Sequence, residues 1–275
     1  MWTLSGFADE IDLDLEVQLR TLAETSIAHL ELRGVWGKNV LALTDEELGR
    51  VKTALAAAGV KVSAIGSPIG KIGIGDDFAP HVEQFRRAMD IAEVLAAPYV
   101  RIFSFFLPPG DAPTRHRSEI LSRLERLVRL AEERGVTLAH ENERHIYGET
   151  PERCHDLLAT IDSPRLRAVW DPANFVLTGV RPHDEGYALL RPYLAYVHVK
   201  DAIATSGTVV PAGEGDGQLR ETLTALRADG FDGFFSLEPH LASAGQFGGF
   251  SGPQQFRRAA DAFKGLLRDL DIAWA

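Results

Sequence analysis

The chain has 275 residues, of which 45% are hydrophobic and 25% charged, and its formal net charge at pH 7 is -10. This composition is that of a folded globular protein, which excludes extensive disorder, and the length suits one (β/α)8 domain. The negative charge and the scattered Lys and Arg residues disfavour a nucleic acid partner, which usually binds a basic patch.

The sequence gives no sign of a membrane protein. It has no uninterrupted apolar stretch of the roughly 18 residues that a membrane span requires. Its first residues, MWTLSGFADE, lack the basic and apolar regions of a secretory signal peptide. The only cysteine, Cys154, cannot form an intrachain disulfide. We therefore expect a cytoplasmic protein with no membrane partner.

Short apolar, β-branched and aromatic runs are spaced along the whole chain and predict eight β-strands. They are Trp2 to Phe7, His29 to Leu32, Lys61 to Ile65, Tyr99 to Phe103, Val136 to His140, Leu166 to Trp170, Leu194 to Val199 and Phe234 to Leu237. Segments with helical spacing lie between them, such as the one in which Ile120, Leu124, Leu127 and Ala131 share a face. Strand and helix therefore alternate, as in parallel α/β folds.

The predicted helices have recognisable ends. Thr44 and Thr150 stand where N-terminal caps are expected, and Gly59 and Gly135 follow helical segments and lead directly into strands. Turns this short favour a closed barrel, and the first strand-to-helix turn has no dinucleotide-binding glycine pattern. We therefore predict a single (β/α)8 TIM barrel that forms one domain over residues 1–275.

Four long segments without periodicity each follow a predicted strand. They cover residues 66–77, 104–113, 201–217 and 240–253. In a TIM barrel, such segments lie on the catalytic face. The glycine-rich part, residues 244–252, is expected either to close over a substrate or to be an ordinary surface loop.

Four residues that can ligate a metal stand at the carboxyl ends of separate predicted strands: Glu141, Asp171, His198 and Glu238. The carboxyl ends of barrel strands meet at one face, so these side chains are expected to converge. Two glutamates, an aspartate and a histidine form a mostly oxygen ligand set, which suits Mn, Mg, Co or Zn. The sequence therefore predicts a site for one divalent metal ion.

Several short motifs follow one another in a defined order. They are Glu31-Leu-Arg33, His140-Glu-Asn142, Trp170-Asp-Pro-Ala-Asn174, His198-Val-Lys-Asp201, Gly213-Glu-Gly-Asp216 and Leu237-Glu-Pro-His240. In this order they resemble the xylose isomerase-like TIM barrels, which include sugar isomerases and epimerases, inosose-processing enzymes and dehydroshikimate dehydratases. The likeness covers nearly the whole chain.

The resemblance implies that the four predicted ligands hold one divalent metal ion and that the substrate is a small carbohydrate. It implies an isomerase or epimerase of a keto sugar or keto-polyol. Glu141 and Glu238 would lie on opposite sides of the substrate and exchange a proton next to a metal-bound carbonyl, through an enediolate. Family members often carry a histidine where this chain has Asn174, which can hydrogen-bond to a substrate hydroxyl but cannot act as a base.

Further candidates surround these residues in the motifs and strands. Lys200 and His240 are expected either to polarise substrate oxygens or move protons, or to form structural ion pairs. Arg33 and Arg101 are expected either to bind hydroxyl, carboxylate or phosphate groups or to have the same structural role. Glu214 stands in a tight glycine turn, where we expect either contact with the substrate or a structural role.

Two other functions stay open from the sequence. Loss of a β-hydroxyl from the same kind of intermediate would make the protein a lyase or dehydratase of an inosose, a dehydroshikimate-like ring or a 3-keto-glycoside. A non-catalytic carbohydrate-binding barrel would bind without turnover. The exposed barrel helices and the family resemblance also make a homo-oligomer an expectation.

Overall fold

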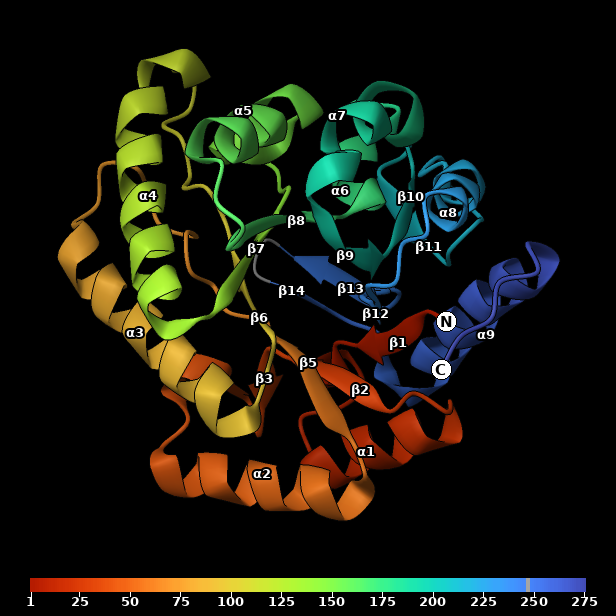
Figure 1. The fold of residues 1–275 in the computed structure, drawn as a ribbon. Coiled ribbons are helices and arrows are strands. Elements are labelled where there is room, and N and C mark those ends of the chain that lie inside the picture. The colour runs from red at the N-terminus through yellow and green to blue at the C-terminus, as the bar shows by residue number, and fades with distance from the viewer. Residues whose placement is uncertain (246–247) are drawn as a thin grey trace.

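The computed structural model describes residues 1–245 and 248–275 and contains an eight-stranded parallel sheet rolled into a barrel (Figure 1). Its strands are β1 (Thr3–Gly6), β2 (His29–Leu32), β5 (Lys61–Ile65), β6 (Tyr99–Ile102), β7 (Thr137–Glu141), β8 (Leu166–Trp170), β9 (Leu194–Val199) and β12 (Phe234–Leu237). They are ordered β1-β12-β9-β8-β7-β6-β5-β2. A parallel bridge between Phe7 and Glu31 joins the two outer strands, β1 and β2. The predicted TIM barrel fold is confirmed.

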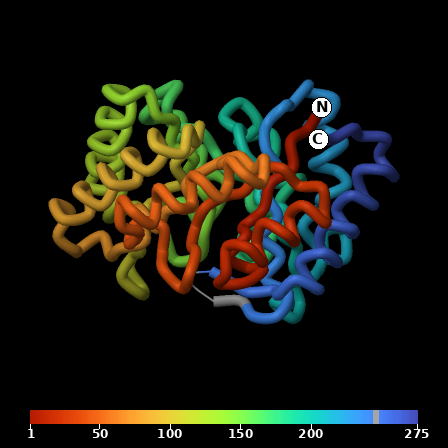
Figure 2. Tube along the Cα trace, turned by 90° about the horizontal axis from the view of Figure 1, so that it is seen from below, coloured from red at the N-terminus to blue at the C-terminus, as the bar shows by residue number. Residues whose placement is uncertain are grey.

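Helices form a layer around the barrel (Figure 1, Figure 2). They are α1 (Leu15–Glu24), α2 (Asp45–Ala58), α3 (Phe78–Leu95), α4 (Arg117–Arg134), α5 (Pro151–Ile161), α6 (Pro172–Val176), α7 (Ala188–Leu190), α8 (Leu219–Ala228) and α9 (Gly252–Asp269). Each long helix turns an apolar stripe toward the strands, as α9 does with Phe256, Phe263 and Leu267, which are fully buried. The main hydrophobic core therefore lies between sheet and helices. None of the helices in the described ranges has both the length and the apolar character needed to cross a bilayer.

The helix ends follow the sequence signals in three of four cases. Thr44 Oγ1 accepts a hydrogen bond from the Glu47 backbone N–H, and the Glu47 carboxylate accepts one from the Thr44 N–H, which completes a capping box. Gly59 and Gly135 adopt the left-handed conformation that ends α2 and α4. The position predicted for Thr150 is correct, because it directly precedes α5, but the expected cap is absent, since its side chain makes no capping hydrogen bond.

Three short hairpins stand beyond the ends of barrel strands, and the sequence predicted none of them. They are β3 (Gly34–Val35) with β4 (Lys38–Asn39), β10 (Asp201–Ile203) with β11 (Thr208–Val210), and β13 (Ser243–Gly245) with β14 (Gly248–Phe250). Their two- and three-residue strands are too short to show a periodic pattern. Gln246 and Phe247, in the loop expected to close over a substrate, lie outside the described residues.

Side chains fill the interior of the barrel. A small apolar cluster there consists of Ala64, Ala139, Val169 and Tyr196. Beside it, the Ser63 hydroxyl is hydrogen-bonded to Tyr196 Oη at 2.7 Å and to Ser5 Oγ at 2.6 Å. All three of these side chains are buried. The barrel is therefore a packed core and not a pore, and space for a ligand is confined to its mouth.

The contrast between the two threonine caps can be tested by unfolding. We expect Thr44→Ala to lower the free energy of unfolding by about 1 kcal/mol, because the Glu47 N–H loses its acceptor. Thr150→Ala is the matched control and should change it by less than about 0.5 kcal/mol, since no capping bond is removed. Urea unfolding of both variants measures the difference. Equal losses would contradict the assignment of the two caps.

Candidate active site

The four predicted metal ligands meet at the carboxyl end of the barrel. Glu141 is the last residue of β7, Asp171 and Glu238 directly follow β8 and β12, and His198 stands near the end of β9. These strands are consecutive neighbours in the sheet, which is why ligands far apart in the sequence come together. All four side chains are buried, with at most 3% of each residue exposed.

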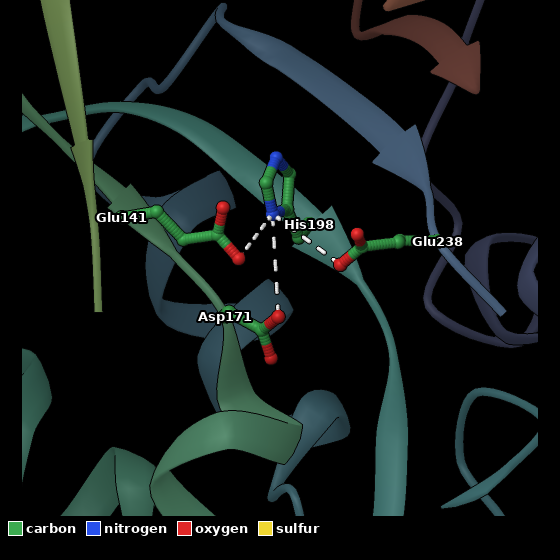
Figure 3. Close-up of side chains that lie close together, drawn as sticks. All are labelled: Glu141, Asp171, His198 and Glu238. Atoms are coloured by element: carbon green, nitrogen blue, oxygen red, sulfur yellow. Dashed lines mark ion pairs between the residues drawn. The ribbon is translucent and has the colours of Figure 1, made fainter. Parts of the chain in front are cut away.

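The three carboxylates surround one nitrogen of His198 (Figure 3). Nδ1 of His198 lies 3.2 Å from Glu141 Oε1, 3.8 Å from Glu238 Oε2 and 4.0 Å from Asp171 Oδ2. Glu141 and Glu238 point toward this nitrogen from opposite sides, and Asp171 approaches it from a third (Figure 3). The prediction that these four residues converge is therefore correct as geometry.

The donor atoms of this cluster fit a divalent cation. One ligand atom from each of the four residues lies within 4.8 Å of all the others. Within the described part of the chain, Glu141 Oε2, Asp171 Oδ2 and His198 Nδ1 are buried and make no hydrogen bond of good geometry, although each lies within ion-pair distance of a side chain of opposite charge. Buried polar atoms are rarely left in this state, and carboxylate oxygens with one imidazole nitrogen suit a hard or borderline ion.

Glu31 holds the other side of the His198 ring. Glu31 Oε2 lies 3.2 Å from Nε2 of His198, so a proton on Nε2 would leave Nδ1 free to bind a metal. Burial lowers the pKa of His198, but the carboxylates of Glu141 and Glu31 outweigh this and raise it to about 10. The sequence analysis named Glu31 in a motif but gave it no role. Glu31 lies on β2 two residues before Arg33, and this spacing, which places both side chains on the same side of the strand, was the available signal.

Lys200 is placed among the ligands themselves. Its Nζ lies 2.7 Å from Asp171 Oδ2 and 2.9 Å from Glu238 Oε2. Burial lowers the pKa of Lys200, yet these two carboxylates together raise it above its ordinary value, so the ammonium stays charged. Lys200 thus neutralises two buried carboxylates and is also within reach of a ligand bound there.

The two arginines expected to bind substrate also contact the cluster. Arg33 donates from Nη1 to Glu238 Oε1 at 2.9 Å and from Nε to Asp9 Oδ2 at 2.7 Å. Arg101 Nη1 lies 3.1 Å from Glu141 Oε2. Burial raises the pKa of Glu141, but His198 and Arg101 lower it to about 2. His198 and Arg101 therefore keep Glu141 ionised, and Arg33 forms an ion pair with Glu238.

His240 lies between two carboxylates at the end of β12. Its Nε2 is 3.1 Å from Glu10 Oε1 and 3.4 Å from Glu238 Oε1. Burial lowers the pKa of His240, but Glu238 and Glu10 raise it to about 9. Gly249 of β14 covers the ring so closely that a Cβ there would lie 2.1 Å from His240 Cδ2. No sequence motif pointed to Glu10, which comes close to His240 only through the fold.

The Asn174 side chain contacts Glu141, one of the four proposed metal ligands. Its Nδ2 donates to the backbone oxygen of Asn142 at 3.0 Å and to Glu141 Oε1 at 3.3 Å. The Asn142 side chain in turn exchanges two 2.9 Å hydrogen bonds with the backbone of Asp171. These amides fix the positions of Glu141 and Asp171, so Asn174 has a positioning function here in addition to any contact with a substrate hydroxyl.

Glu214 is the one predicted site residue that the fold does not bring to the cluster. Its side chain is half exposed and pairs with Arg258 on α9 at 3.3 Å. The turn that carries it is organised by the buried Asp201, whose carboxylate accepts hydrogen bonds from the backbone N–H groups of Gly213, Gly215 and Gly217. The glycine motif therefore serves this turn, and the structural reading of Glu214 is the one that the contacts favour.

Comparison with known proteins identifies the family. The model of the xylose isomerase-like TIM barrel family matches residues 19–266. The chain belongs to this family. A relative from an Actinoplanes species, named 2-epi-5-epi-valiolone 7-phosphate 2-epimerase, is 32% identical over 194 residues, which is 70% of this chain and 69% of the relative.

Solved structures of this family have the same fold. A D-tagatose 3-epimerase-like protein superposes with a TM-score of 0.78 at 19% identity, covering 98% of both chains. A probable 3-DHS dehydratase from Bacillus anthracis gives 0.75 at 19% identity, covering 96% of this chain and 98% of that one. The IOLI protein, whose crystal structure contains zinc, gives 0.74 at 17% identity over 98% and 97%. These structures show the shared fold, and the Actinoplanes relative supports the assignment of the chain as an enzyme of the family.

The compensating role of Lys200 can be tested by a shape-conserving substitution. We expect Lys200→Met to lower the free energy of unfolding in EDTA by about 3 kcal/mol or more, because two buried carboxylates lose their cation. Added divalent cation should restore more stability to this variant than to the wild type. Lys38→Met, which breaks the exposed pair with Glu47, is the control and should cost about 1 kcal/mol or less. Similar losses in both variants would contradict the role of Lys200.

Proposed function

We propose that the protein is a divalent-metal-dependent isomerase or epimerase of a small keto sugar or keto-polyol. The observation that carries this proposal is the opposed placement of Glu141 and Glu238 within a buried cluster of four residues that suit a metal ion. Two carboxylates on opposite sides of one position can exchange protons with both faces of a substrate carbon. The Actinoplanes relative, named as an epimerase, supports the same reaction type.

Glu141, Asp171, His198 and Glu238 would hold the metal ion. When bound, a divalent ion supplies a Lewis acid that polarises a substrate carbonyl and so acidifies the neighbouring C–H bond. The identity of the ion, Mn, Mg, Co or Zn, belongs to the proposal, and the zinc in the IOLI structure supports one of these. Glu31, Asn142 and Asn174 keep the ligand side chains in position.

The proton steps are assigned to the two glutamates. Glu238 removes a proton from the carbon next to the carbonyl, and Glu141, after taking up a proton from water, returns one from the opposite face. Glu238 then releases its proton to water, so that the configuration inverts and no atom is lost. Burial raises the pKa of Glu238, but Lys200 and His240 hold it well below its ordinary value, which keeps Glu238 ionised to accept a proton. Lys200 and His240 also place positive charge where negative charge would develop on a substrate oxygen.

A lyase or dehydratase is the second candidate function, because the fold is shared with a probable dehydratase. In this reaction, proton removal is followed by loss of a β-hydroxyl. The two functions differ in what leaves the substrate. Incorporation of solvent deuterium without loss of water supports the epimerase, whereas a new ultraviolet-absorbing enone supports the dehydratase. Both depend on the metal ion, and a protein that binds carbohydrate without either reaction would contradict both.

Removing one carboxylate tests the assignment of the proton steps. We expect Glu238→Gln to keep the fold and to reduce turnover by at least about a hundredfold, since an amide cannot accept the proton. Glu141→Ala should lower metal content as well as turnover. The matched control is Glu214→Gln, which alters only a half-exposed ion pair and should retain activity and metal. Near-normal turnover by Glu238→Gln would refute the assignment, as would unchanged metal content in Glu141→Ala after dialysis.

The contact between Glu31 and His198 predicts an effect on metal affinity. We expect Glu31→Gln to weaken divalent metal binding by about 10- to 100-fold, because the neutral amide is a poorer partner for the ring N–H of His198. Competition titration with a fluorescent chelator measures this affinity. Glu24→Gln, which removes an exposed partner of Arg257, is the control and should bind metal like the wild type. Unchanged affinity in Glu31→Gln would show that His198 needs no such partner.

A further inference from the structure

A groove of about 610 Å³ lies beside the four proposed metal ligands. One wall is the β3–β4 hairpin and the other is β14, and Asp9, Leu13 and Arg33 complete the lining. The volume is within the range that small-molecule sites use. None of the four proposed metal ligands lines this groove, so it is space beyond the cluster itself.

The groove is directly connected to the proposed chemistry through Arg33. The guanidinium of Arg33 lines the groove and pairs there with Asp9, and its Nη1 donates to Glu238 Oε1 at 2.9 Å. Gly248 of β14 lies on this guanidinium, since a Cβ at Gly248 would be 3.0 Å from Arg33 Cζ. A group in the groove is therefore separated from the Glu238 carboxylate by one side chain.

The charges of the groove favour an uncharged occupant. Arg33 is compensated by Asp9 at 2.7 Å, and Lys38, at the rim, is compensated by Glu47 at 2.6 Å. An anionic group such as a phosphate would have to compete with both carboxylates.

The rim of the groove is apolar and exposed. Leu13 and Phe250, which both line it, expose 59% and 40% of their surface, although large hydrophobic side chains are mostly buried in this protein. An aromatic ring at the edge of a polar groove suits the C–H face of a sugar ring, whose hydroxyls remain free for polar partners. Apolar rim and compensated charge together match a neutral sugar ring.

We infer that this groove binds a second, uncharged sugar ring of the substrate, so that the enzyme acts on a keto sugar that carries a glycosyl group. The inference rests on the proposed function, because it assumes that the reacting ring lies at the four proposed metal ligands. Arg33 would then stand at the junction of the two rings. Phe250 and Leu13 contribute to affinity for the second ring and take no part in the chemistry.

Binding of matched fructose derivatives tests this inference. The probes are D-fructose, D-fructose 6-phosphate, and the disaccharides isomaltulose, turanose and lactulose, which attach a neutral sugar ring to different oxygens of fructose. Their affinities for the full-length protein with Mg²⁺ are measured by saturation-transfer NMR. We expect at least one disaccharide to bind about tenfold more tightly than D-fructose, and the phosphate to bind no more tightly than D-fructose. Phe250→Ala and Leu13→Ala should remove the preference, whereas Val94→Ala, at an exposed apolar position on α3, should retain it.

The outcomes separate the inference from the proposed function. Equal affinity for D-fructose and all three disaccharides overturns the inference and leaves the proposed function standing. Tightest binding of D-fructose 6-phosphate overturns it in favour of an anion site, and so does a disaccharide preference that survives in Phe250→Ala and Leu13→Ala. Failure of every probe to bind overturns the proposed keto-sugar function and the inference with it.

Discussion

Compensation of buried carboxylates is the constraint on which the mouth of this barrel depends. Five buried carboxylates and three buried permanent cations meet at this mouth: Glu10, Glu31, Glu141, Asp171 and Glu238 against Arg33, Arg101 and Lys200. Asp9, which pairs with Arg33 at 2.7 Å, adds a sixth carboxylate. Buried charge without a partner is strongly destabilising, so the excess of three negative charges must be met. Protons on His198 and His240 would compensate part of it, and a divalent cation held by the four proposed ligands would compensate two of these charges.

The barrel satisfies this constraint by placing cations on both sides of the ligands. The four proposed ligands come from β7, β8, β9 and β12, which adjoin one another in the sheet. Arg101 comes from β6, which is the neighbour of β7, whereas Arg33 follows β2 and Lys200 follows β9. Each arginine reaches one of the glutamates assigned to proton transfer, and Lys200 reaches Asp171 and Glu238. The hairpins after β2 and β12 enclose the side where Arg33 lies.

The sequence allowed the strands and the four converging residues to be predicted because both signals are local. A ligand at the end of an apolar run is visible in six residues of sequence, and the barrel rule does the rest. The partners of these ligands were not predictable in this way. Glu10 and His240 are 230 residues apart in sequence, yet the His240 N–H donates to the Glu10 carboxylate. For Glu214 the sequence motif was visible but its role was misleading. The Asp201 carboxylate organises the glycine turn that carries Glu214, and the Glu214 side chain pairs with Arg258 away from the site.

The pairing of Arg33 with Glu238 joins positions 205 residues apart, from the second and the last strands of the barrel. Contacts of such sequence separation form only after a large loss of chain entropy. A fragment that begins at β7 would contain all four ligands and Lys200 but neither arginine nor Glu31, so Glu141 would lack its partner Arg101. Assembly of the complete site is therefore a late event that reports closure of the whole barrel.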